Sequence, residues 1–285
     1  MNILSEFDAG ALAAARKNVP DTLLLEPEPT PWPALEGVVG VFFTSRTGST
    51  ALMRIAESNF ELGQVEESLN AEDLLVRTRK RAFDTLQQTL KWYIRQTSGA
   101  GWFMFKAGVP GLMNAARIGF LEEYGAIIRP VFLLRRDILG QALSLFVAQH
   151  TRRFHSTQEA QRELTEQDYD PAALETLMTI IRGANSQIAH LLPFFAFPPQ
   201  VLFYEEFSGG DEARAIDTFA AAGLPRRDEP RLNPRRVVHK ITHPLTAQFR
   251  ERFMAGLSER GAQLLADHDR FIADWQAQRD AAGRS

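Results

Sequence analysis

Hydrophobic positions along the chain follow two patterns that predict different elements. Short runs of branched and aromatic residues, at 38–43, 102–106, 127–134 and 201–204, are typical of strands buried on both faces. Between these runs, apolar residues recur at helical spacing. Strands separated by helices predict an α/β fold, in which right-handed crossovers join a parallel sheet flanked by helices.

Capping residues predict where the helices begin. The first strand runs into a turn of small residues at 45–50, followed by a helix at 51–59. Asn70 is placed to cap a long helix, whose first turn carries Glu72 and Asp73 and which continues to the glycines near residue 99. Further helix starts are expected at Pro110, Asp137, Asp170, Glu212, Pro244 and Ser258.

The chain of 285 residues is long enough for one α/β domain with elaborations. Prolines crowd the segment 27–33, which favours an extended conformation. We therefore divide the chain into an N-terminal proline-rich arm, 1–36, and a single domain, 37–285. The arm either lies over the core or places Trp32 in an interface with a partner.

Charge and composition narrow the function classes. A net charge of −3 argues against a general nucleic-acid binder. The absence of cysteine excludes disulfides, thiol nucleophiles and thiolate metal sites, and no His-Glu-x-x-His pattern is present. Neither a secretory signal nor an apolar run of the ~20 residues needed to span a bilayer is visible. We expect a cytoplasmic protein without a transmembrane segment or a metal.

The turn after the first strand predicts an anion site. It contains Ser45, Arg46, Thr47, Gly48, Ser49 and Thr50. Backbone N–H groups and the dipole of the following helix favour negative charge at such a turn. The nucleotide-triphosphate loop requires Gly-Lys-Ser/Thr, however, and here Arg46 carries the only full positive charge. The turn therefore indicates a phosphate-like ligand rather than ordinary ATP hydrolysis.

A second anion site is predicted where the third strand ends. Arg135 follows this strand, and Ser144 lies about two turns into the next helix. A guanidinium donates two parallel hydrogen bonds to a phosphate. The alternative is that Arg135 and Arg136 are surface residues paired with a nearby acid such as Asp137. Because ligands of parallel sheets bind at the carboxyl ends of the strands, Lys106 and Glu205 are expected on the same edge.

In these blocks the chain resembles the 3′-phosphoadenosine 5′-phosphosulfate-dependent sulfotransferases, most closely the bacterial trehalose 2-sulfotransferase type. The resemblance covers roughly residues 38–255. It implies a P-loop-like central parallel sheet, this nucleotide as sulfonate donor, and a hydroxyl of a carbohydrate, glycolipid or other small metabolite as acceptor. It places the 5′-phosphosulfate on the turn 45–50, the 3′-phosphate on Arg135 and Ser144, and a further nucleotide contact on Lys240.

The resemblance also implies which residues act on the acceptor. Glu67 matches the general base that removes the proton of the acceptor hydroxyl, with Glu66 as the adjacent alternative and His150 as a reserve. Arg46 would stabilise charge on the leaving group. Lys106 matches a lysine that contacts the sulfonate or the acceptor; alternatively it is a solvated lysine at a strand end.

Two other functions stay open at this point. One is a P-loop small-molecule kinase, against which the missing lysine argues. The other is a non-catalytic nucleotide-binding module, motivated by the proline-rich arm and by Ser68 and Leu69, where the family usually has two aromatic residues. The identity of the acceptor and the oligomeric state, a homodimer included, also stay open.

Overall fold

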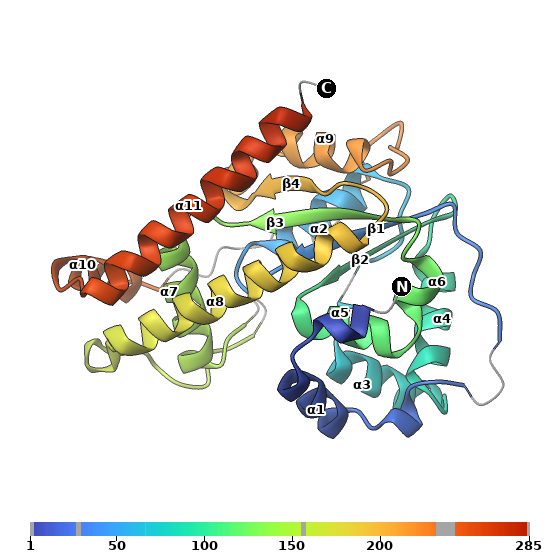
Figure 1. Cartoon of the computed structure of the whole chain (residues 1–285), viewed down its shortest axis with the longest axis horizontal. Helices are drawn as coiled ribbons and strands as arrows, with labels where there is room; N and C mark the ends of the chain where they lie inside the picture. The colour runs from blue at the N-terminus through green and yellow to red at the C-terminus, as the bar shows by residue number, and fades with distance from the viewer. Residues whose placement is uncertain (1–2, 27–29, 66, 155–157, 232–242, 284–285) are drawn as a thin grey trace.

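The computed structural model describes residues 3–26, 30–65, 67–154, 158–231 and 243–283. Its centre is a sheet of four parallel strands in the order β2-β1-β3-β4. The strands are β1 (Gly37–Phe43), β2 (Trp102–Ala107), β3 (Ile128–Leu134) and β4 (Gln200–Phe203). Helices lie on both faces of this sheet (Figure 1). The predicted α/β class, with a central parallel sheet flanked by helices, is confirmed.

Both faces of β1 are buried, which explains its uninterrupted apolar sequence. Val39 and Val41 belong to a core cluster with α2 (Ser49–Asn59) and α9 (Ala213–Ala221). Val38 and Phe42 point to the opposite face, because side chains alternate along a strand. That face is covered by α4 (Leu86–Thr97), α5 (Val109–Arg117), α6 (Phe120–Tyr124), α8 (Pro171–Leu191) and α11 (Glu259–Ala282).

A third apolar cluster lies beyond the edge of the sheet. It joins α7 (Ile138–Thr151) and α10 (Leu245–Ala255) to parts of α8 and α11. Figure 1 shows α10 at one end of the molecule, at the left of the view, and α1 (Ala9–Asn18) below the sheet near α3. The 3₁₀ helices are Ile3–Glu6, Asp21–Leu23, Glu166–Asp168, Leu192–Phe194 and Tyr204–Glu206.

The single long helix expected after Asn70 is wrong, because the segment forms two helices. Asn70 caps the first as predicted, accepting from the N–H groups of two first-turn residues. The chain then turns at Ala82, whose φ of 53° is left-handed, and Thr85 caps a second helix. The two helices pack against each other through the hydroxyls of Thr78 and Thr89, 2.7 Å apart. They are α3 (Ala71–Arg81) and α4.

The other predicted helix starts are confirmed. Side chains of Asp137, Asp170 and Ser258 accept backbone N–H groups at the beginnings of α7, α8 and α11. Pro110 lies in the first turn of α5, where its missing N–H costs nothing. Glu212 and Pro244 directly precede α9 and α10.

The N-terminal segment packs onto the core. Ile3, Phe7, Val19 and Leu24 belong to the same apolar cluster as β1. Residues 30–36 form no helix or strand. Trp32 packs edge-on against Phe120 and Tyr124, at centroid distances of 6.1 and 5.6 Å. Its indole is therefore packed against the core and partly buried.

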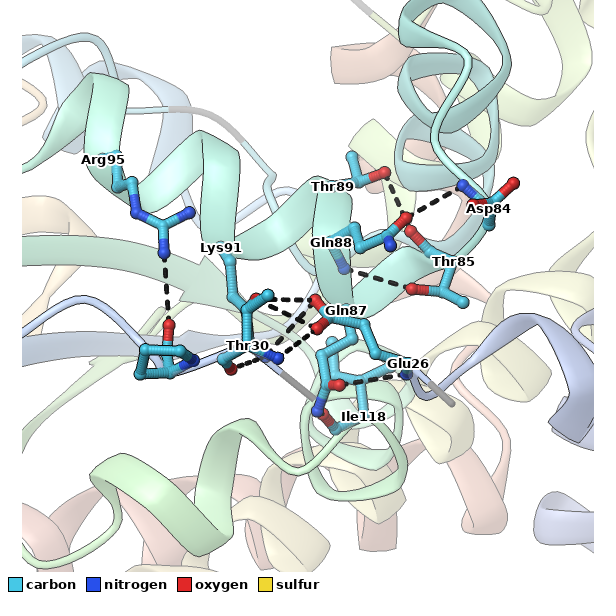
Figure 2. Close-up of polar contacts among 11 residues, drawn as sticks. Glu26, Thr30, Asp84, Thr85, Gln87, Gln88, Thr89, Lys91, Arg95 and Ile118 are labelled. Carbon is cyan, nitrogen blue, oxygen red and sulfur yellow. Dashed lines mark hydrogen bonds and ion pairs between the residues drawn. The ribbon is translucent and has the colours of Figure 1, made fainter. Parts of the chain in front are cut away.

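A buried ion pair fastens this segment to α4 (Figure 2). Lys91 Nζ lies 3.3 Å from Glu26 Oε1, and each side chain is only 1% exposed. Glu26 also accepts the N–H of Thr30 at 2.6 Å, and the Lys91 ammonium lies 5.0 Å from the centre of the Trp32 ring. Burial alone would raise the pKa of Glu26, but the hydrogen bonds from Thr30 and Lys91 outweigh it and lower the pKa. Both charges are thus compensated inside the protein.

Candidate anion-binding site

The candidate site lies at the carboxyl ends of the strands. Chain order places β2 on one side of β1 and β3 on the other, so the strand order reverses at β1. Parallel sheets bind ligands outside the strand ends at such a reversal. The turn after β1, Lys106 in β2, Arg135 after β3 and Tyr204 after β4 all belong to this edge.

The turn after β1 has a constrained backbone. Arg46 and Gly48 both have left-handed φ values, 69° and 77°. A Cβ atom on Gly48 would lie 2.5 Å from the ring of Tyr204, so glycine is required by space as well as by conformation. Thr47 is buried, and its hydroxyl donates to the carbonyl of Thr44 at 2.8 Å. The turn is therefore held before any ligand arrives.

The N-terminus of α2 is open toward this turn. Gly48 is its N-cap residue and has no side chain to accept a hydrogen bond, and no side-chain cap is present. The first-turn N–H groups of a helix have no partner within the helix. Together with the helix dipole they favour an anion.

Gln141 ties the turn to α7. Its Nε2 donates to Thr44 Oγ1 at 2.9 Å and to the carbonyl of Ser45 at 2.7 Å. The side chain of Gln141 is completely buried, whereas Ser45 is exposed at the edge. Neither Gln141 nor Tyr204 has a role predicted from the sequence. In the sequence, Gln141 stands among the apolar residues at the start of α7, and an amide in such a position needs hydrogen-bond partners when it is buried. This pattern could have identified Gln141.

Arg46 connects the two predicted anion sites. Its Nε donates to Ser144 Oγ at 2.9 Å, and its Nη1 donates to the carbonyl of Phe154 at 2.9 Å. Its own carbonyl accepts from Arg135 Nη1 at 3.2 Å. Within the described residues, the Arg46 guanidinium thus contacts only neutral oxygens. Burial, followed by the charge of Arg135, lowers the pKa of Arg46, so an anion between these side chains would be stabilised.

Arg135 is held above an aromatic ring and away from solvent. Its guanidinium lies 4.7 Å from the centre of the Tyr204 ring, and its side chain is 11% exposed. Asp137 lies 3.9 Å away, but its carboxylate also caps α7 and pairs with Arg250. The alternative of a surface ion pair fits Arg136 instead, which is 37% exposed and bonds Glu206 at 2.9 Å.

Glu205 fixes the backbone that carries Arg135. Its carboxylate accepts the N–H of Arg136 at 3.1 Å and that of Asp137 at 3.3 Å. Glu205 lies on the predicted edge of the sheet, and its carboxylate faces the backbone of the turn after β3.

Lys106 joins the turn to Glu67. Its Nζ lies 2.8 Å from Glu67 Oε1 and 3.3 Å from Thr50 Oγ1. Lys106 is buried, so the alternative of a solvated lysine is wrong; the Glu67 side chain is 36% exposed. The partly exposed Glu67 carboxylate, which can accept a proton, is thus linked to the turn through Lys106.

The remaining predicted residues lie apart from this cluster or cannot be placed. His150 Nε2 lies 3.1 Å from Asp168 Oδ1, and its ring stacks on Phe146. Hydrogen bonds from Thr165 lower the pKa of Asp168, which keeps this partner of His150 ionised. Glu66 and Lys240 lie outside the described residues.

In the described part of the chain, no group of three or more His, Asp or Glu side chains is arranged to hold a metal ion. None of the helices in that part is long and apolar enough to cross a membrane.

The chain has a distant likeness in fold to a solved protein structure. No family model matches the chain, and no curated protein matches it. The fold is similar to a crystal structure of a sulfotransferase from Alicyclobacillus acidocaldarius, with a TM-score of 0.46 and 14% identity. The alignment covers 83% of this chain and 97% of that one. A likeness at this level leaves the chemistry to be argued from the residues of the site.

Proposed function

We propose that the chain is a sulfotransferase that moves a sulfonate from 3′-phosphoadenosine 5′-phosphosulfate to a hydroxyl of a carbohydrate, glycolipid or other small metabolite. The observation that carries this proposal is the position of Arg46. Its main chain belongs to the open turn at α2, its carbonyl contacts Arg135, and its guanidinium contacts Ser144. Two cationic side chains and an uncapped helix N-terminus therefore converge on one small region.

The donor carries negative groups at both ends, which suits this arrangement. Its 5′-phosphosulfate would bind the turn, where Arg46 and the N–H groups of Ser49 and Thr50 donate hydrogen bonds. Its 3′-phosphate would bind Arg135 and Ser144. The hydroxyl of Ser144 now accepts from Arg46, so a bound phosphate would take a place between them. Lys240 is proposed as a further contact to the nucleotide.

Transfer would proceed by in-line displacement at sulfur. The acceptor oxygen forms a bond to sulfur, and the bond from sulfur to the bridging phosphate oxygen breaks. The electron pair of that bond leaves with adenosine 3′,5′-bisphosphate, and Arg46 stabilises the negative charge that develops there, while Lys106 contacts the sulfonate or the acceptor. Glu67 accepts the proton of the acceptor hydroxyl, which gives a sulfate ester.

The direct test is to incubate the purified protein with donor labelled in its sulfonate group and a panel of sugars and glycolipids. Label on a hydroxyl of any acceptor is the expected result. Binding of the nucleotide without transfer across a broad panel would favour the non-catalytic module. Turnover of ATP that depends on Mg²⁺, with no sulfonate transfer, would favour the kinase.

A further inference from the structure

A buried histidine lies beneath the proposed 3′-phosphate site. His268 belongs to α11, far from Arg135 in sequence, and its side chain is completely buried. Its Nε2 lies 2.9 Å from the main-chain carbonyl of Arg135. The C-terminal helix thus contacts the residue that is proposed to bind the 3′-phosphate.

The contact determines the state of the imidazole. A carbonyl oxygen only accepts hydrogen bonds, so Nε2 must carry the proton and donate it. Nδ1 is buried and has no hydrogen-bond partner among the described groups, so a proton there would lack an acceptor, which favours the neutral ring protonated at Nε2. Burial lowers the pKa of His268, in agreement with a neutral ring at physiological pH. Burial is the largest effect, while hydrogen bonds to the main chain of Arg135 and Arg136 and the charge of Asp269 on α11 raise the pKa of this ring, and the charge of Arg182 on α8 lowers it.

His268 and Glu205 hold the same turn from two sides. His268 binds the carbonyl of Arg135, while Glu205 accepts the N–H groups of the next two residues. The Arg135 side chain leaves the backbone between these two anchors and reaches the ring of Tyr204. Loss of either anchor would allow the turn to shift, and with it the guanidinium.

The turn is also attached to the far end of α11. Arg136 Nη2 donates to Gln276 Oε1 at 3.0 Å, and Arg279 bonds Glu206 at 2.8 Å. These contacts keep α11 along the strand end, as Figure 1 shows for its course beside β4. His268 is the member of this set that contacts the backbone of Arg135 itself.

We propose that His268 is a positioning residue of the nucleotide site, whose neutral Nε2–H fixes the Arg135 carbonyl so that the guanidinium faces the 3′-phosphate. This inference rests on the proposed function. It extends the site to α11, which the sequence motifs do not include.

The test compares His268→Leu, which removes the donor, with His268→Gln, whose side-chain amide keeps one. His190→Leu is the control, because His190 is an exposed histidine that pairs with Glu6 away from the site. Calorimetry gives the affinities for adenosine 3′,5′-bisphosphate and for adenosine 5′-monophosphate. We expect His268→Leu to weaken the bisphosphate about tenfold and the monophosphate less than about twofold, with His268→Gln within about threefold of the unaltered chain.

The outcomes separate the two proposals. Equal loss for both nucleotides, or no loss, would overturn the positioning role while leaving the proposed function intact. If the unaltered chain does not prefer the bisphosphate, the proposed function fails and this inference with it. Should His268→Leu fail to fold, nitrogen–proton correlation spectra of the unaltered chain decide. An Nε2–H ring that stays neutral below the ordinary pKa of 6.5 supports the role, and an Nδ1–H ring or a charged ring above that pH overturns it.

Discussion

The guanidinium of Arg135 donates a hydrogen bond to the main-chain carbonyl of Arg46, 3.2 Å away. Two motifs that lie far apart in the sequence are therefore in direct contact at the edge of the sheet. Loss of the Arg135 side chain should weaken binding of the 3′-phosphate of the proposed donor more than binding of its 5′ end.

We expect Arg135→Ala to weaken adenosine 3′,5′-bisphosphate by about tenfold to a hundredfold, because a charge-assisted hydrogen bond contributes ~1.5–3 kcal/mol. Adenosine 5′-monophosphate, which lacks the 3′-phosphate, should lose much less. Calorimetric titration of both nucleotides measures the difference, and Arg16→Ala, at an exposed arginine of the N-terminal segment, is the control. Equal weakening of the two would remove Arg135 from the 3′-site.

Gly48→Ala should destabilise the protein by ~1–3 kcal/mol and abolish tight donor binding. The new Cβ would have a left-handed φ of 77° and would lie 2.5 Å from the ring of Tyr204. Gly209→Ala is the control, since nothing lies within 4 Å of a Cβ there and its φ is not left-handed. Urea unfolding of both variants checks this. A Gly48→Ala protein as stable as the control would contradict the described turn.

Glu67→Gln should lower kcat by about 10²–10⁴-fold, since the amide cannot accept the proton of the acceptor hydroxyl. Donor affinity should change little, because Glu67 contacts Lys106 rather than the turn itself. Initial rates at saturating donor give the comparison, and Glu72→Gln, on the exposed first turn of α3, is the control. An unchanged kcat would transfer the role of base to Glu66 or His150.

Lys91→Met should cost ~3–5 kcal/mol of stability, because it leaves the Glu26 carboxylate buried without its partner. Adding Glu26→Gln to this variant should recover much of the loss. Denaturant unfolding of the single and double variants provides the measurement, and Lys80→Met, at an exposed position, is the control. A loss no larger than that of the control would show that the buried pair contributes little.

The stability of the protein should respond to His268 on the acid side of neutrality. Burial keeps the pKa of the folded-state ring below its ordinary value of 6.5. Below pH 6.5 the unfolded chain binds a proton that the folded chain does not, so the free energy of unfolding falls as the pH falls. Above that pH both rings are neutral and the difference disappears. Unfolding measured at several pH values should show a shallower acid decline in His268→Gln than in the unaltered chain.

The sheet could be predicted from the sequence because a strand that is buried on both faces consists of a continuous run of apolar residues. The predicted first strand, 38–43, differs from β1 by one residue. Helix starts were equally accessible, since an Asn, Asp or Ser cap acts on its own first turn. These signals are local, so they can be recognised in the sequence without knowledge of the tertiary structure.

The break between α3 and α4 has one local signal, the cap residue Thr85, but no glycine or proline interrupts the segment. Apolar spacing continues across Ala82, and an alanine normally favours a helix. Its left-handed conformation follows from the packing of two helices against each other, which local propensity does not encode. The sequence therefore predicted the residues of this segment as helical but not its fold-back.

The predicted anion-site residues of the two motifs lie at one edge of the sheet, but their partners could not be predicted. Gln141, Tyr204 and His268 act on the site through contacts with residues that are distant in sequence. A histidine within a polar helix gives no sign of which carbonyl it will meet. The roles of the site residues stay predictions until ligands and variants are measured.

The packing of the first residues sets a practical limit on shortening the protein. Ile3, Phe7, Val19 and Leu24 cover the same apolar cluster that supports β1. A truncated chain that begins at Gly37 would expose this apolar cluster to solvent and would leave Lys91 without its partner Glu26. Such a truncated chain would tend to aggregate during purification, even though every residue of the candidate site would still be present.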